Sequence, residues 1–424
     1  MTLSRKSMAQ ATHHLIYRFP MGLYRVTSRF FLRLALLLAA ACPLAHARAG
    51  DWDVVTVGGR QYVTVASLAR FYDFPQAVPP VSRLPTASPD APLAKQLLLD
   101  NGKHQILFTL NSRIAVIDGV NQWLGFPVIA DGDTLVLSRL DLSKTIEPSL
   151  RPQFIAGLGP VDTVVLDPGH GGYDKGAVCI FGNEKDFALD VCFRARKLLQ
   201  AAGIRVLMTR SDDTFIPLDQ RPMVANDTPH SIFVAVHFND SAENPYASGF
   251  EIYSIAPQGE PSTQDNTLAL HDLHAEPGNV TDIPSLALSE SIYHAMLGNI
   301  PQVDRGIKRA RFAVLRFAQV PAVLIEGGFV SSDTEARQIA TPAYRQELAA
   351  AIVTGIEGFK TLAEHNIPPK LLADYRRATA LGSPGAPIVQ TNSPTVILNT
   401  PAILNLPAAA DPATTPSASP AQMQ

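Results

Sequence analysis

The sequence predicts an α/β fold in which a largely parallel or mixed sheet is sandwiched by helices, preceded by a small strand-rich module. Three observations lead to this class. Apolar runs of strand length alternate with helical stretches over residues 161–362, short strand-like runs fill residues 51–145, and 46% of the 424 residues are hydrophobic. This length exceeds one typical domain, so we expect a main domain and an accessory module.

Residues 1–49 have the composition of a signal peptide. They carry seven basic residues and no acidic one, and the apolar run from Leu34 to Ala41 is shorter than the roughly 20 residues that span a bilayer. Small residues from Ala45 to Ala49 offer cleavage sites, so we expect membrane contact only during export. An uncleaved anchor and lipidation at Cys42 are alternatives, and Met21 is an alternative start.

Removal of this segment leaves an acidic chain, with 28 of the 35 Lys and Arg residues against 38 Asp and Glu. Proteins that bind polyanions carry basic patches, and the remaining sequence has no such cluster, so we expect no nucleic-acid partner. Of the three cysteines, Cys179 and Cys192 remain. Their spacing is compatible with a disulfide and equally with two buried thiols.

Residues 51–145 predict a strand-rich module, because runs such as HQILFTL and DTLVLSRLDL are separated by turn signals. A helix is expected after Thr64, and the Pro-rich segment 76–92 predicts a loop. The pattern resembles the small stalk domains of bacterial envelope proteins, and none of its residues has a spacing that indicates chemistry. We therefore interpret it as a spacer or a wall-contact module, followed by a linker at 146–160.

The main domain is expected at 161–362. Its predicted strands are 163–167, 204–210, 232–237, 249–255 and 322–326, and its predicted helices are 184–203, 218–226, 285–298 and 333–361. Residues 366–424 are rich in Pro, Ala, Thr and Ser. Such a segment cannot bury enough apolar surface to offset its chain entropy, so we expect a disordered tail.

Four polar residues stand at strand ends or at a helix start: His170, Glu184, His237 and Glu326. Each of the first three has an ordinary structural explanation; Glu184, for example, is favoured at a helix N-terminus by the helix dipole. Glu326 ends an apolar run, where a carboxylate is costly to bury without a partner. Together, two imidazoles and a carboxylate form a standard catalytic zinc set, and the second carboxylate can serve as general base.

Six motifs occur in a fixed order: VVLDPGHGGYDKGA, NEKDFAL, LDQRPMVAN, VAVHFND, DRGIKRARFAVLR and PAVLIEGGFVS. This order resembles the zinc-dependent N-acetylmuramoyl-L-alanine amidases (amidase type 3). The resemblance implies that His170, Glu184 and His237 bind zinc (Zn²⁺), that Glu326 is the catalytic base and that Asn239 contacts substrate. The implied reaction cleaves the amide between N-acetylmuramic acid and L-alanine of the peptidoglycan stem peptide, in the periplasm or at the cell wall.

Two alternatives stay open at this point: a non-catalytic wall-binding or regulatory protein that retains the fold, and a different zinc hydrolase such as a carboxypeptidase or deacetylase. The long segment 257–284 contains His271, His274 and Glu276. These are either solvated loop residues or part of a regulatory lid over the metal, as in autoinhibited amidases that need a protein activator. Phe238, where the family has a small residue, predicts a narrower groove beside the metal.

Overall fold

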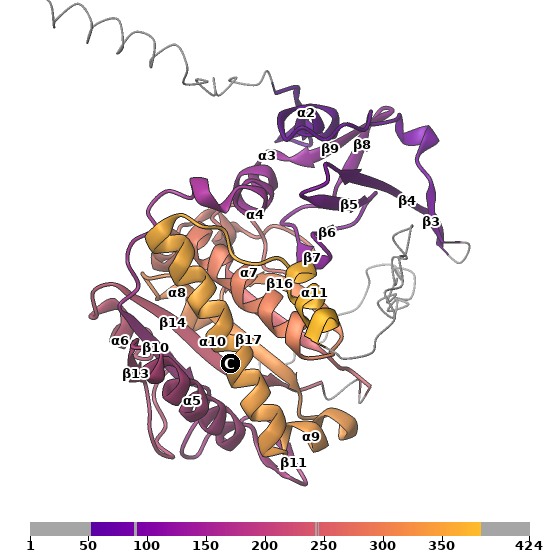
Figure 1. The fold of residues 1–424 in the computed structure, drawn as a ribbon. Helices are drawn as coiled ribbons and strands as arrows, with labels where there is room; N and C mark the ends of the chain where they lie inside the picture. Colours follow the sequence, from indigo (N-terminus) through magenta and orange to yellow (C-terminus); the bar gives the residue numbers. More distant parts are fainter. Residues whose placement is uncertain (1–51, 89–90, 242–243, 245, 383–424) are drawn as a thin grey trace, which may run out of the picture. The chain divides into compact units, whose positions relative to one another are not determined.

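The computed structural model describes residues 52–88, 91–241, 244 and 246–382 (Figure 1). The predicted signal peptide and residues 383–424 of the predicted tail lie outside this range. The described residues belong to one compact unit. Among the described residues, no helix combines the length and the apolar composition that a bilayer crossing requires.

The main domain is built on a mixed sheet, which confirms the predicted fold class. Four strands are parallel in the order β13, β10, β14 and β17. Strand β15 is antiparallel to β17, and β16 is parallel to β15. Their bounds are β10 Thr163–Pro168, β13 Arg205–Met208, β14 Ser231–Asn239, β15 Phe250–Ile255, β16 Asp304–Ala310 and β17 Ala322–Phe329.

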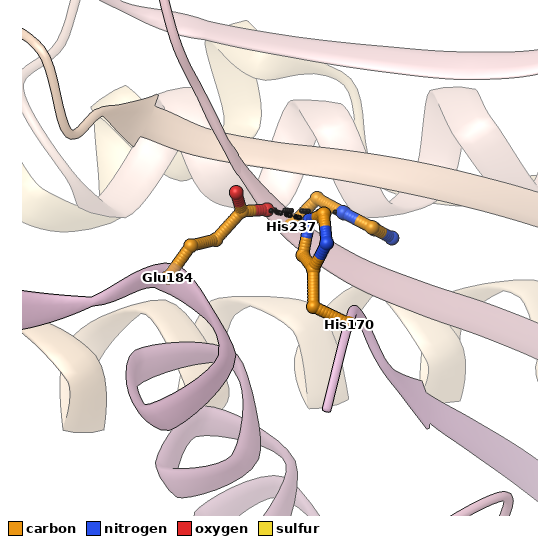
Figure 2. Close-up of side chains that lie close together, drawn as sticks. All are labelled: His170, Glu184 and His237. Atoms are coloured by element: carbon orange, nitrogen blue, oxygen red, sulfur yellow. Dashed lines mark hydrogen bonds and ion pairs between the residues drawn. The ribbon is translucent and has the colours of Figure 1, made fainter. Parts of the chain in front are cut away.

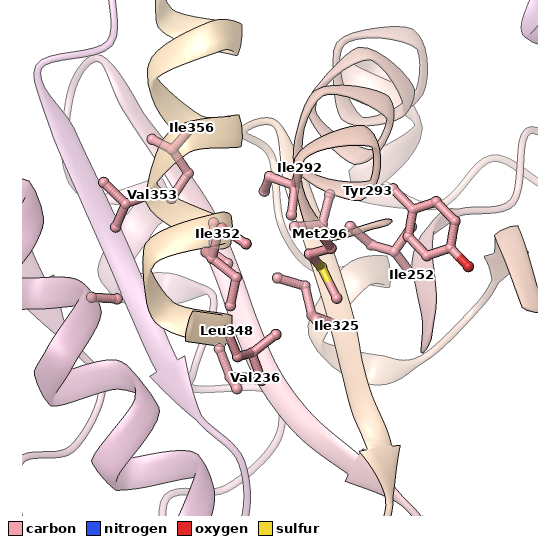
Figure 3. Close-up of a cluster of buried hydrophobic side chains, with 14 of the residues drawn as sticks. Val236, Ile252, Ile292, Tyr293, Met296, Ile325, Leu348, Ile352, Val353 and Ile356 are labelled. Atoms are coloured by element: carbon pink, nitrogen blue, oxygen red, sulfur yellow. The ribbon is translucent and has the colours of Figure 1, made fainter. Parts of the chain in front are cut away.

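Helices cover both faces of this sheet, because successive strand residues point to opposite sides. On β10, Val164 and Leu166 pack into one core and Val165 into the other. The first core is closed by α5 (Glu184–Ala201), α7 (Asp282–Asn299) and α10 (Pro342–His365), and the second by α6 (Met223–Asn226) and α8 (Ala313–Arg316). Figure 3 shows α7 and α10 packing through side chains such as Ile292 and Ile352 above the strands.

The N-terminal module is strand-rich, as predicted, and its strand β7 pairs in parallel with β16. The main sheet therefore continues into the module and has eleven strands, with a separate small sheet in the order β1, β2, β9 and β8. Thr64 caps helix α2 (Val65–Phe71) by accepting from the Ser67 amide. The strands are β1 Val54–Val57, β2 Arg60–Thr64, β3 Thr86–Ser88, β4 Ala91–Asp100, β5 Gln105–Thr109, β6 Ile114–Ile117, β7 Val120–Trp123, β8 Ile129–Asp131 and β9 Thr134–Ser138.

The linker prediction for 146–160 is wrong for most of that segment. A run of short helices enters this segment: α3 (Arg139–Asp141) and η2 (Leu142–Ile146) lead into it, and α4 (Glu147–Leu150) and η3 (Pro152–Phe154) lie within it. Ile146 and Leu150 are buried in the core of the module. Their burial outweighs the proline content that suggested a linker.

Three other segments differ from the predictions. The predicted tail contains helix α11 (Leu372–Gly382), which is ordered because Leu372 is buried against the main core. Prolines are absent from this stretch, unlike the rest of the tail. The predicted helix at 333–361 is two helices, α9 (Asp333–Ile339) and α10, which begins after the capping residue Thr341. The predicted loop at 76–92 contains η1 (Val81–Arg83) and β3.

Candidate metal centre

His170, Glu184 and His237 meet beside the carboxyl ends of β10 and β14, at the first turn of α5 (Figure 2). His170 Nε2 and His237 Nδ1 each lie 3.0 Å from Glu184 Oε1. One ligand atom from each residue lies within 4.8 Å of the other two, an arrangement that could hold a metal ion. The structure thus brings the three predicted ligands to one point.

The backbone around His170 is shaped so that these side chains can approach each other. His170 itself has φ +60°, in the left-handed region that non-glycine residues rarely adopt. A Cβ on Gly169 would lie 2.4 Å from His237 Cε1, and one on Gly176 would lie 2.5 Å from Glu184 Oε2. Any side chain at these two positions would displace a ligand.

Two buried arginines donate hydrogen bonds to the backbone of this turn. These bonds help to hold His170 in its left-handed backbone conformation. The Arg221 guanidinium donates to the His170 carbonyl at 2.8 Å and to Asp167 Oδ1 at 3.0 Å. Arg210 donates to the Gly169 carbonyl at 2.7 Å. Arg221 lies in one of the motifs described above, whereas Arg210 is a residue that the sequence reasoning missed.

Asp174 is a second missed residue. Its Oδ2 lies 2.8 Å from His170 Nδ1, which fixes the ring so that Nε2 faces Glu184. Second carboxylates of this kind commonly orient metal-bound histidines. Its position four residues after His170, in the same Gly-rich turn, is the signal that would have found it.

The electrostatics of the three ligands favour a bound cation. Burial alone would raise the pKa of Glu184, but the two imidazoles beside it lower that pKa below its usual range. Burial would lower the pKa of His170, whereas Glu184 and Asp174 together raise it. Glu184 therefore stays ionised, and two imidazole nitrogens with one carboxylate oxygen form a donor set that fits catalytic zinc.

Glu326 lies directly beside this centre. It is the cross-strand partner of His237 on β14 and of Glu251 on β15, so the three side chains share one face of the sheet. Glu326 Oε2 is buried and has no hydrogen-bond partner in the structure. Burial, together with the charges of Glu184 and Glu251, raises the pKa of Glu326, and Lys308 opposes this rise.

Comparison with known proteins is consistent with this geometry. Residues 164–358 match the family model described as N-acetylmuramoyl-L-alanine amidase. The N-acetylmuramoyl-L-alanine amidase AmiA of Escherichia coli (strain K12) is 31% identical over 247 residues, which cover 53% of this chain and 85% of AmiA. The chain belongs to the N-acetylmuramoyl-L-alanine amidase family.

Two further proteins are similar to this chain. AmiC of Escherichia coli O6:H1 is 31% identical over 243 residues, which cover 52% of this chain and 58% of AmiC. The catalytic domain of CwlV from Bacillus (Paenibacillus) polymyxa var. colistinus is 29% identical, with a TM-score of 0.39 over 46% of this chain and 96% of that domain. This chain therefore matches less than two thirds of the length of AmiC.

Asn239, the predicted substrate contact of the amidase, is already engaged in the structure. Its amide Nδ2 donates to Glu251 Oε1 at 2.5 Å. A register shift separates His237 from Asn239, so the end of β14 bends just after the ligand. Asn239 thus links the metal centre to Glu251, and its contact with substrate stays a prediction.

The predicted lid is not over the metal in this structure. Segment 257–284 follows β15, and because β15 is antiparallel to β17 it leaves the sheet at the end opposite the ligands. Thr281 Oγ1 donates to the Val320 carbonyl, just before β17 begins, and Glu276 pairs with Arg316 of α8. His271 and His274 are exposed there. The direction of β15, which sequence length cannot reveal, overturns this interpretation.

The predicted effect of Phe238 is also wrong. Its side chain is 2% exposed and packs in the first core, 6.3 Å from the Phe187 ring. It points to the face of the sheet opposite His237, so it does not narrow a groove beside the metal. Cys179 and Cys192 are free thiols, which leaves the fold without a disulfide between them.

Proposed function

We propose that this amidase hydrolyses the amide bond between N-acetylmuramic acid and L-alanine of the peptidoglycan stem peptide, using zinc held by His170, Glu184 and His237. The observation that carries the proposal is the convergence of these three ligand atoms next to Glu326. A chain that had become a non-catalytic wall-binding protein would have no need to keep the ligands and the adjacent carboxylate together.

Glu326 has the chemistry of a general base and acid for this reaction. Zinc, when bound, polarises the substrate carbonyl and activates water as a Lewis acid. Glu326 accepts the proton from the attacking water at its carboxylate, where Oε2 has no competing donor from the protein. It then passes that proton to the alanine nitrogen as the amide C–N bond breaks.

Product analysis on purified sacculi tests the proposal. Mass spectrometry should find released stem peptides with a free L-alanine amine and an uncut glycan. EDTA should abolish the release and added zinc should restore it. Cleavage within the glycan, loss of a terminal amino acid alone or removal of an acetyl group would assign the metal centre to another hydrolase. Activity that resists EDTA would contradict the metal assignment.

We further propose that the protein is exported, because its substrate class lies outside the cytoplasmic membrane and residues 1–49 have signal-peptide composition. Fractionation of cells should recover a shortened chain in the periplasm or with the wall. A protein activator stays a prediction. With segment 257–284 at the other end of the sheet, such a partner would have to act elsewhere.

A further inference from the structure

A row of side chains crosses the sheet from the metal centre to the N-terminal module. It starts with His237, Glu326 and Glu251, which are paired across β14, β17 and β15. The next two strands continue it, with Lys308 on β16 and Trp123 on β7, each one position beyond the paired residues Ile307 and Gln122. Lys308 is also the cross-strand partner of Tyr253, two residues beyond Glu251.

Glu251 is the centre of this row and is held from both sides. Its side chain is buried, and Lys308 Nζ donates to its Oε2. Arg305 Nε donates to the same oxygen at 3.2 Å, while Asn239 holds Oε1. Burial would raise the pKa of Glu251, but these two cations lower it, so it stays charged beside Glu326. In this position its charge is one of the causes that raise the pKa of Glu326.

The module supplies one of the two aromatic rings against which Lys308 lies, the other being Tyr253 of β15 at 5.6 Å. The Lys308 ammonium is 5.7 Å from the centroid of the Trp123 ring, within cation–π range. Trp123 Nε1 donates to the Arg305 carbonyl at 3.3 Å. A Cβ on Gly306, which has φ +98°, would lie 3.0 Å from Trp123 Cδ1. Trp123 thus touches each of the residues 305, 306 and 308 that shape the cationic part of the row.

We propose that the N-terminal module is part of the catalytic unit, in which Trp123 is a positioning residue that seats Lys308 so that Glu251 stays fixed beside Glu326. The module is then more than a spacer, the role that its sequence suggested. This inference rests on the proposed function for its kinetic consequences, although the Trp123–Lys308 contact can be measured without any activity.

Steady-state kinetics of the full, zinc-loaded chain test the positioning role. Trp123→Ala and Lys308→Met should each lower kcat about tenfold, which is the lower end of the range of effects expected for residues that orient a reacting group. KM should stay within about twofold of wild type. Trp123→Phe and Lys308→Arg should recover most of kcat, because ring and charge are kept. Trp52→Phe is the matched control, since Trp52 packs on Phe71 within the module.

A purely structural role predicts another pattern, in which Trp123→Ala lowers the melting temperature while kcat per folded, zinc-bound enzyme equals that of Trp52→Phe. That result would overturn the proposal. The proposal would also be overturned if Lys308→Met left kcat unchanged.

Fluorescence separates this inference from the proposed function. The chain has two tryptophans, so Trp52→Phe leaves Trp123 as the sole indole. Adding Lys308→Met to that variant should shift the emission, because an ammonium is removed from beside the ring; an unchanged spectrum would refute the contact. If Trp52→Phe and wild type both fail to release stem peptides while the emission shifts, the proposed function fails and the contact stands.

Discussion

Two clusters of buried carboxyl groups in this protein differ in the direction of their pKa shifts. At the metal centre, Glu184 lies between two imidazoles and Glu251 lies against Lys308 and Arg305, and the pKa of each is lowered. Both therefore remain ionised inside the protein. Burying a charge is affordable there because each carboxylate has positive or hydrogen-bonding partners at its oxygens.

The second cluster lies where the N-terminal module packs on the main domain. Burial raises the pKa of Asp141 to about 7, of Glu260 to about 8 and of Glu290 to about 7. Neither oxygen of Glu260 has a hydrogen-bond partner in the structure. Burial thus favours the protonated form of all three groups, although Asp141 and Glu290 accept hydrogen bonds. The comparison indicates that Glu184 and Glu251 keep their charge because imidazoles or cations contact their oxygens, whereas burial favours the neutral form of the junction carboxyls.

The largest effect is expected at the metal centre, from loss of the proposed base. Glu326→Gln keeps the shape of the side chain and removes its ability to take a proton, so kcat should fall about a thousandfold. Zinc content, measured by atomic absorption, should not change because Glu326 is not a ligand. Glu357→Gln, at an exposed position on α10, is the control. Residual activity above about a tenth of wild type would move the base elsewhere.

A smaller effect is expected from Asp174→Asn, since an amide still accepts from His170 Nδ1 but no longer carries the charge that favours it. We expect zinc affinity to fall about tenfold, with kcat nearly unchanged at saturating zinc. Competition with a chromogenic chelator measures the affinity, and Asp227→Asn, exposed at the end of α6, is the control. Unaltered affinity would show that the ring of His170 is held by the backbone turn alone.

Sequence reasoning could find the ligands because they stand at strand ends and a helix start, where function gathers in an α/β sheet. It could not find Arg210, whose partners are fixed by the path of one turn, and it overlooked Asp174, although its spacing of four residues from His170 was visible in the sequence. Strand β16 was missed because DRGIKRA is rich in charge. Its charges have partners in the fold: Arg305 and Lys308 meet Glu251, and Arg309 donates to Ser254 Oγ. The pairing of β7 with β16 depends on a short polar strand that carries no apolar alternation.

The junction predicts a pH-dependent stability that Glu260→Gln should remove. Below about pH 4.5, the ordinary pKa of this carboxyl, Glu260 is neutral in both states. As pH rises toward about 8, the unfolded chain ionises first, so the folded protein loses stability over this window. Glu260→Gln should therefore raise the free energy of unfolding by about 1–3 kcal/mol at pH 8 and by much less at pH 5. Urea titrations at both pH values measure this, and an equal change at each would contradict a protonated junction.

The smallest expected effect, and the sharpest test of the comparison, comes from Glu290→Gln. Glu290 belongs to the protonated cluster, yet its Oε1 accepts from Gln122 Nε2 at 2.6 Å and from Ser149, so its charged form is better solvated than that of Glu260. Its pKa of about 7 also lies closer to the ordinary range. We expect a gain below about 1 kcal/mol at pH 8 in the same urea titrations. A gain larger than that of Glu260→Gln would mean that hydrogen bonds to a buried carboxyl do not moderate its cost here. Such a gain would also mean that Glu290 is the most pH-sensitive carboxyl of the junction. Glu290 is hydrogen-bonded to Gln122, which is next to Trp123 on β7, so this carboxyl would lie close to the row of side chains that leads to Glu326.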